Sequence, residues 1–141
     1  MDDLSVLVAS VCHEDLACFE VVLRDTGWRF QCAHSAADAV AFVRAQRALV
    51  VVSEPDLPGG SWKQLLSRLI EEGHPSTLLV LSHRADERLW SEVLHLGGYN
   101  VLPKPFDRTD VTRTLALAWR QCKERCAGSV TGSRQSHQDV G

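Results

Sequence analysis

The stretch ALVVVSEPDLPGG, residues 48–60, places two acids directly after an apolar run. An apolar run that ends in acids is typical of a buried strand whose carboxyl end reaches a functional site. The first acid is Glu54 and the second is Asp56. A carboxylate at such a strand end can attack an electrophile, help to hold a cation, or pair with a basic side chain. The function therefore depends on which acid lies at the strand end and on which groups face it.

Three further apolar runs end in polar or charged side chains. The runs SVLVAS, STLLVLS and NVLPK end at Ser10, Ser82 and Lys104. Functional sites of open parallel sheets lie at the carboxyl ends of the strands. If all of these runs are parallel strands, Ser10, Glu54, Ser82 and Lys104 should form one cluster.

Apolar runs alternate with amphipathic segments as far as residue 124. The predicted strands cover residues 5–10, 28–33, 48–53, 76–82 and 100–104, and the predicted helices cover residues 14–27, 35–46, 61–73, 85–98 and 107–124. Strands that are apolar at consecutive positions are expected where helices cover both faces of a sheet. Five strands and five helices in strict alternation predict an α/β fold with a doubly wound, five-stranded parallel sheet in the flavodoxin-like order 2-1-3-4-5.

The composition describes an ordinary globular domain. Of the 141 residues, 45% are hydrophobic and 23% are charged, which excludes a disordered chain as a whole. The predicted domain covers residues 1–124, and the small, polar residues 125–141 are predicted to form a disordered tail or linker. The net charge of −3 argues against direct binding of nucleic acid, because phosphate contacts need a clustered basic surface. No run has the length of a membrane span, and the acidic start MDD is unlike a signal peptide, so a cytoplasmic location is expected.

The cysteines favour no disulfide framework, because their number is odd and their spacing is irregular. The five are Cys12, Cys18, Cys32, Cys122 and Cys126. Cys122 and Cys126 are one helical turn apart, but a zinc site needs two more ligands and no matching pair stands nearby. Free thiols are the expected state.

The strand ends and the spacing between them resemble the receiver domain of bacterial two-component response regulators, the CheY-like domain. The resemblance covers residues 4 to about 121. Its most specific part is LLVLS ending at Ser82, a glycine at Gly97 and then LPKPF at residues 102–106. The sequence LPGG at residues 57–60 and Gly27 also match the pattern without a gap.

In a working receiver, as the resemblance implies, a carboxylate on the third strand attacks a phosphoryl donor and becomes an acyl phosphate. A divalent cation held by two acids at the end of the first strand bridges that carboxylate and the phosphoryl oxygens. A lysine on the fifth strand pairs with the phosphoryl group. A hydroxyl on the fourth strand closes onto it and carries the change to the face formed by the fourth helix, the fifth strand and the fifth helix.

Placed on this sequence, the family pattern is kept in part. The hydroxyl is Ser82 and the lysine is Lys104, followed by Pro105. The nucleophile position, an aspartate in the family, falls on Glu54. The acid pair falls on Ser10 and Val11, so the metal-binding corner is degenerate, and Val101 stands where an aromatic often moves with the hydroxyl.

These substitutions predict altered chemistry. The extra methylene of Glu54 moves the carboxylate outward by about an ångström, which is large for an attack geometry. One carboxylate beside Ser10 and Val11 should bind Mg²⁺ weakly or not at all, so no cofactor is expected. The Glu54 carboxylate can instead reach Lys104 and supply a fixed negative charge in place of a transient phosphoryl group.

Other acids and aromatic residues leave alternatives open. Asp56 lies where a backbone carbonyl commonly helps to hold the metal in this family; it can accept phosphate, ligate a cation or only cap its loop. Glu14 and Asp15 can approach a cation near the degenerate corner, or can be acids favoured at a helix N-terminus. Trp90 and Trp119 can be core residues or anchors of an interface.

The sequence thus predicts a degenerate receiver domain that is not an enzyme. It would bind a signalling protein, an output domain or a second copy through the face that contains the fourth and fifth helices, independently of phosphorylation. No membrane or nucleic-acid partner is expected. The alternative is a Mg²⁺-dependent phosphoacceptor receiver that uses Glu54 or Asp56.

Overall fold

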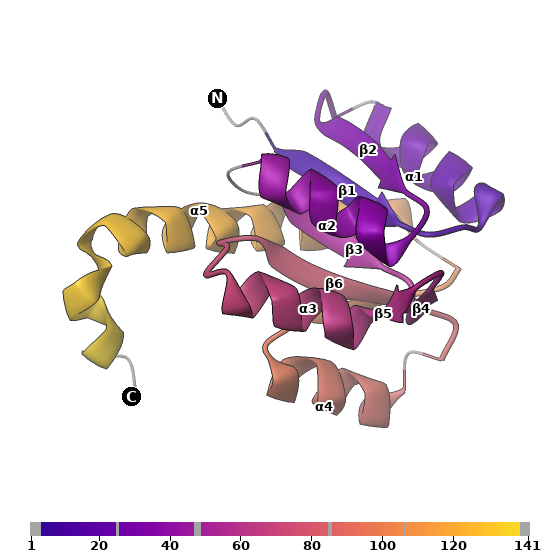
Figure 1. Cartoon of the computed structure of the whole chain (residues 1–141). Helices are drawn as coiled ribbons and strands as arrows, with labels where there is room; N and C mark the ends of the chain where they lie inside the picture. Colours follow the sequence, from indigo (N-terminus) through magenta and orange to yellow (C-terminus); the bar gives the residue numbers. More distant parts are fainter. Residues whose placement is uncertain (1–3, 25, 47–48, 85, 106, 139–141) are drawn as a thin grey trace.

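The computed structural model describes residues 4–138 except residues 25, 47–48, 85 and 106, and it describes side chains as far as Arg125. The strands are β1 (Ser5–Ala9), β2 (Arg29–Ala33), β3 (Val50–Ser53), β4 (Asp56–Leu57), β5 (Gly60–Ser61), β6 (Thr77–Ser82) and β7 (Asn100–Pro103). The helices are α1 (His13–Arg24), α2 (Ala36–Ala45), α3 (Trp62–Glu71), α4 (Glu87–Leu96) and α5 (Arg108–Gln138). Figure 1 shows their arrangement.

The main sheet has the predicted topology. Its five strands are ordered β2-β1-β3-β6-β7 and all pairs are parallel, which is the expected 2-1-3-4-5 order with the strands numbered through the chain. The register places Ala9 beside Ser53, Ser53 beside Val80, and Ser82 beside Pro103. The carboxyl ends of β1, β3, β6 and β7 therefore lie together at one edge of the sheet.

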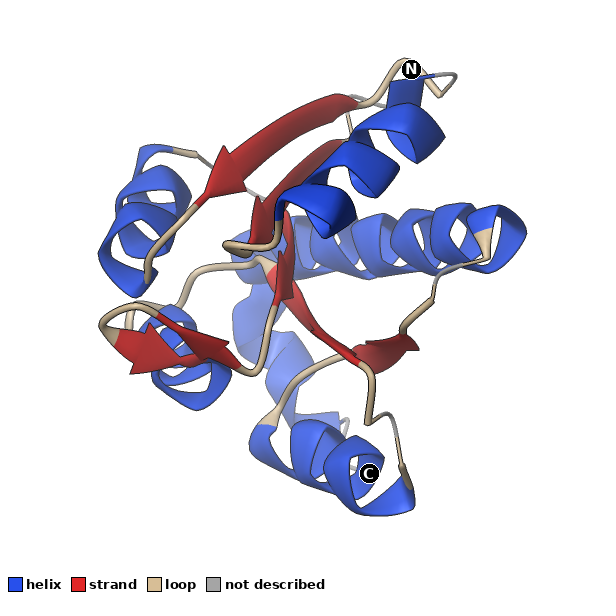
Figure 2. Ribbon diagram, turned by 90° about the vertical axis from the view of Figure 1, so that its right-hand side faces the viewer, coloured by secondary structure: helices blue, strands red, loops and turns tan. Residues whose placement is uncertain are grey.

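Helices cover both faces of the sheet, as the consecutive apolar strand positions require. One core cluster joins the sheet to α2, α3 and α4 through residues such as Val43, Leu65 and Val93. The other joins it to α1 and α5 through residues such as Phe19 and Leu115. Figures 1 and 2 show α2, α3 and α4 on one side and α1 and α5 on the other.

The helix boundaries follow the capping residues that the sequence indicates. The Ser35 hydroxyl accepts a hydrogen bond of 3.1 Å from the Asp38 backbone N–H at the start of α2. The Asp107 carboxylate accepts one of 3.0 Å from the Asp110 N–H at the start of α5. Gly97 ends α4 in the left-handed region, with φ of 107°.

A short hairpin is present that the sequence analysis did not predict. Strands β4 and β5 pair antiparallel, Asp56 with Ser61 and Leu57 with Gly60, directly after β3. Two-residue strands are too short to show a period of two, so only the turn residues LPGG marked this segment. The hairpin exposes Asp56 and buries Leu57.

The last helix is longer than predicted. Helix α5 runs from Arg108 to Gln138, whereas the sequence analysis ended this helix at Glu124. The division into a domain over residues 1–124 and a disordered tail or linker over residues 125–141 stays a prediction, and residues 1–3 and 139–141 lie outside the described residues. Polar composition does not by itself end a helix, and residues 125–138 contain no proline to break one. Figure 1 shows this part of α5 leaving the sheet. None of the helices in the described part of the chain is apolar over enough of its length to cross a bilayer.

Candidate functional site

Glu54 and Lys104 meet at the carboxyl edge of the sheet. Glu54 follows β3, and its backbone N–H donates to the Ala9 carbonyl at 3.0 Å. Lys104 follows β7, and its N–H donates to the Ser82 carbonyl at 3.1 Å. Hydrogen bonds to neighbouring strand ends thus fix the backbones of Glu54 and Lys104. The Lys104 Nζ lies 2.9 Å from Glu54 Oε1 and 2.8 Å from Glu54 Oε2. The contact predicted from the sequence is present, and the ammonium bridges both oxygens of the carboxylate.

Ser10 completes the Glu54 environment from β1. Its side chain is fully buried, and its hydroxyl donates to Glu54 Oε2 at 2.9 Å. The same hydroxyl accepts from the Cys12 backbone N–H at 3.0 Å. Ser10 therefore orients Glu54 and closes the loop that leads into α1.

Asp15 is a partner of Lys104 that the sequence analysis did not identify. It lies in the first turn of α1, and its Oδ2 is 2.5 Å from Lys104 Nζ. The sequence showed Asp15 only as an acid near the degenerate corner or at a helix N-terminus. Nothing in its local pattern indicated a contact with a lysine that follows the fifth strand of the sheet.

The three charged side chains are well shielded from solvent. Their exposed fractions are 9% for Lys104, 15% for Asp15 and 14% for Glu54. Burial acts to lower the pKa of Lys104, but its hydrogen bonds to Asp15 and Glu54 outweigh burial and raise that pKa above its ordinary value of 10.5. Burial acts to raise the pKa of Asp15, but hydrogen bonds, the one from Lys104 first, bring it below 3.8. Asp15 and Lys104 are therefore both charged at neutral pH.

The side chains of the other residues singled out in the sequence have different surroundings. Ser82 is buried at the end of β6, and its hydroxyl accepts from the Arg84 backbone N–H at 3.0 Å. Val11 is 53% exposed, and Asp56 is exposed in the hairpin. Pro105 is also exposed, after a cis peptide bond from Lys104.

The carboxylates at the cluster are already paired with a positive charge. Both Glu54 oxygens face the Lys104 ammonium, one of them also accepts from Ser10, and Asp15 faces the same ammonium. Val11 contributes no side-chain oxygen. In the described part of the chain, no group of three or more His, Cys, Asp or Glu residues is arranged to hold a metal ion.

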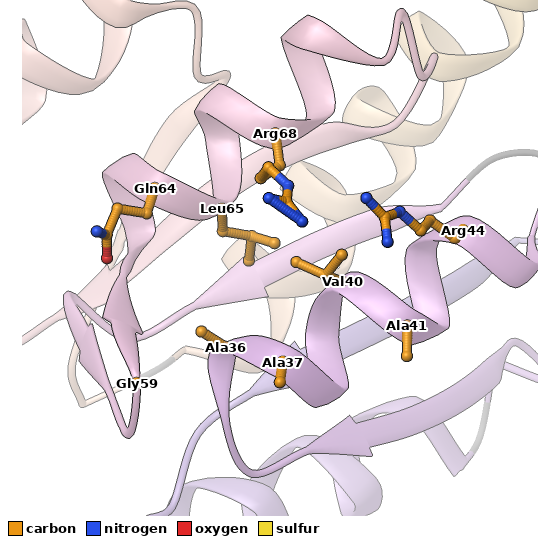
Figure 3. Close-up of a pocket in the computed structure, with 9 residues that line it drawn as sticks. All are labelled: Ala36, Ala37, Val40, Ala41, Arg44, Gly59, Gln64, Leu65 and Arg68. Atoms are coloured by element: carbon orange, nitrogen blue, oxygen red, sulfur yellow. The ribbon is translucent and has the colours of Figure 1, made fainter.

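A separate hollow lies between α2 and α3, shown in Figure 3. Its volume is about 420 Å³, and Ala36, Val40 and Leu65 are among its lining residues. Arg44 and Arg68 point toward each other at one end of it (Figure 3), and Arg44 is bound in a two-point contact to Glu72. None of the strand-end residues described above lines this hollow.

Comparisons with known proteins agree with the receiver resemblance. No family model matches the chain. The transcriptional regulatory protein FixJ of Bradyrhizobium diazoefficiens is 33% identical over 89 residues, which are 61% of this chain; the match spans 43% of FixJ, less than half of its length.

Solved structures show the same fold. The signal receiver domain of an HD domain-containing protein from Pseudomonas fluorescens Pf-5 has a TM-score of 0.78 at 22% identity, covering 89% of this chain and 93% of that one. The beryllofluoride-activated NtrC4 receiver domain dimer has a TM-score of 0.71 at 20% identity, covering 86% and 98%. The resemblance read from the strand ends is therefore confirmed at the level of the fold.

Proposed function

We propose that this chain, which has the fold of a response regulator receiver domain, is a degenerate receiver of two-component signal transduction. It acts as a binding module and not as an enzyme, and aspartyl phosphorylation does not switch it. Its docking face consists of α4, β7 and α5. A cytoplasmic location fits such a role.

The contact of Lys104 with Glu54 and Asp15 carries this proposal. In a working receiver the corresponding lysine pairs with a phosphoryl group that is added and removed. Here two carboxylates that belong to the chain surround the ammonium, at 2.5 to 2.9 Å. A shielded lysine with short charge-assisted contacts to two carboxylates gains little from exchanging them for a phosphoryl group. The site is thus held in one state by its own residues.

The donor set does not fit a resident Mg²⁺ ion. That ion prefers an octahedron of oxygens with carboxylates among them, and the carboxylates here are already paired with the Lys104 ammonium. The end of β1 supplies the Ser10 hydroxyl, whose proton points to Glu54, and the apolar Val11. A cation that entered would have to compete with Lys104 for both carboxylates. We therefore expect Mg²⁺ to bind weakly or not at all.

The docking face has the side chains that an interface needs. Trp90 and Leu94 on α4 and Leu117 on α5 are 47%, 40% and 44% exposed. Trp119 of α5 is half-buried against the core cluster that joins the sheet to α1 and α5. Exposed aromatic and aliphatic groups on the elements of a proposed docking face are typical of a protein-binding surface. The partner is a signalling protein, an output domain of a longer chain or a second copy, and the NtrC4 dimer shows that this fold supports self-association.

Titration with Mg²⁺, with and without beryllofluoride, tests the proposal through tryptophan fluorescence. We expect no saturable change in the millimolar range for the natural chain. The matched control is the triple variant Ser10→Asp, Val11→Asp, Glu54→Asp, which restores the three acids of a working receiver and should respond. A saturable response of the natural chain that beryllofluoride strengthens contradicts the proposal and favours the Mg²⁺-dependent phosphoacceptor that uses Glu54 or Asp56.

A further inference from the structure

A hollow on the surface of α4 and β7 combines an aromatic ring with two carboxylates. It has a volume of about 280 Å³ and is lined by Asp86, Glu87, Trp90, Asn100, Val101 and Pro103. Among the described residues that line it, the only charged ones are acidic. The hollow lies within the face that the proposed function assigns to docking, so the inference below rests on that function.

The indole of Trp90 is held in place and remains open to solvent. Its Nε1–H donates to Asn100 Oδ1 at 2.9 Å, and the same oxygen accepts from the Val101 backbone N–H at 2.8 Å. The residue is nevertheless 47% exposed. A ring with its polar edge satisfied and much of its surface in water is set to receive a partner group without rearranging.

The charge at the hollow is negative. Asp86 is the N-cap of α4 and accepts from the Leu89 N–H at 2.9 Å, and Glu87 is the first residue of the helix. The positive end of the α4 dipole is equivalent to roughly half an elementary charge. Two carboxylates outweigh it, so the hollow attracts a cation and repels an acidic group.

We propose that this hollow binds an arginine side chain of the partner protein. A guanidinium group is planar, so it can lie on the Trp90 ring while its N–H groups face the carboxylates of Asp86 and Glu87. The apolar stem of the arginine can lie along Val101 and Pro103. The partner of this face is thus recognised by a basic residue.

Titration with a blocked peptide, acetyl-Gly-Arg-Gly-amide, tests the proposal by NMR. The probe signals are the Trp90 indole Nε1–H and the Val101 amide. The matched control peptide carries citrulline in place of arginine, because citrulline keeps the shape of the side chain and removes its charge. We expect both signals to move with the arginine peptide, with weak saturation, and to stay in place with the citrulline peptide.

Variants locate the binding site within the hollow. Glu87→Gln and Trp90→Leu should each weaken binding of the arginine peptide about threefold or more. Glu92→Gln is the matched control, because Glu92 is also an acid of α4 but pairs with Lys63 of α3 at 2.5 Å; it should leave binding unchanged. For Trp90→Leu the Val101 amide is the remaining probe.

Three results overturn the proposal. The first is an equal shift of the signals with the citrulline peptide, and the second is no shift with the arginine peptide in the millimolar range. The third is a dimer, detected by sedimentation at the NMR concentration, in which Trp90 is covered. The last result means that a second copy occupies the face. These outcomes are distinct from failure of the proposed function. That failure is read from the response of the chain to Mg²⁺ and beryllofluoride, and not from the NMR signals of Trp90 and Val101 with the peptides.

Discussion

The Asp15 carboxylate lies 2.5 Å from the Lys104 ammonium and thereby connects the first turn of α1 to the end of β7. Lys104 also bridges both oxygens of Glu54 at the end of β3. One lysine therefore joins three elements that are distant in the sequence. The proposed closure of the site to phosphate rests on the same contacts as the stability of this junction, and the first two predictions below concern its stability.

Removal of Lys104 should destabilise the fold more than removal of either carboxylate. Lys104→Met leaves Glu54 and Asp15 facing each other without a cation, and we expect a loss of about 3 kcal/mol in the free energy of unfolding. Glu54→Gln leaves Lys104 paired with Asp15 and should cost about 1 kcal/mol. Urea denaturation of the three proteins measures both values. Equal losses would contradict the central role of Lys104.

Neutralisation of Asp15 should lower the free energy of unfolding only above a pH limit. The folded-state pKa of Asp15 is lower than 3.8, so the stability that its charge contributes is present above pH 3.8 and is lost as the pH falls through the folded-state value. The pKa of Lys104 is raised above 10.5, so its contribution is lost only as the pH rises beyond that. The stability difference between the natural chain and Asp15→Asn should therefore be constant near neutral pH.

Denaturation curves taken at several pH values check this expectation. The difference should shrink toward zero as the pH drops below 3.8. A difference that varies between pH 5 and 8, or that persists in strong acid, would mean that Asp15 acts through packing and not through its charge.

Asp56 should behave as an ordinary surface acid. It is exposed in the β4–β5 hairpin, whereas Asp15 is 15% exposed beside Lys104. Asp56→Asn should change the free energy of unfolding by less than about 0.5 kcal/mol. Asp15→Asn provides the comparison by the same urea denaturation. A loss for Asp56→Asn as large as that for Asp15→Asn would show that the hairpin takes part in the cluster.

The proposed docking face contains a close approach at the end of α4. A Cβ atom added to Gly98 would lie 2.6 Å from Val93 Cγ1 and 3.1 Å from the Val93 carbonyl oxygen. Gly98→Ala should therefore cost about 1 to 3 kcal/mol, because the backbone must shift. Ser91→Ala, at an exposed position of α4, is the control and should be nearly neutral. Thermal unfolding distinguishes the two; equal stability would mean that α4 moves freely against β7.

The sheet could be predicted from the sequence because each strand carries consecutive apolar residues and each helix carries its own caps. Strand order followed from the alternation and from right-handed crossovers. The β4–β5 hairpin was not predicted, since two residues show no period, and the length of α5 was not predicted, since polar residues can remain helical without a breaker. These are limits of local patterns.

The site was predicted in part. The meeting of Glu54, Ser10 and Lys104 followed from placing strand ends side by side, because parallel strands bring their carboxyl ends to one edge. Asp15 was missed because its contact depends on how α1 begins after β1, which no spacing in the sequence records. Val11 had been assigned to the same corner but is 53% exposed, since the chain turns outward after Ser10.

Acetyl phosphate supplied with Mg²⁺, followed by intact-protein mass spectrometry at neutral pH, tests the central claim most directly. The natural chain should show no phosphoryl adduct, while the variant with Ser10→Asp, Val11→Asp and Glu54→Asp, folded by circular dichroism, should show one. A stable adduct on the natural chain that depends on Mg²⁺ and is lost in Glu54→Gln would contradict the claim that Lys104 and its two carboxylates have closed this site to phosphate.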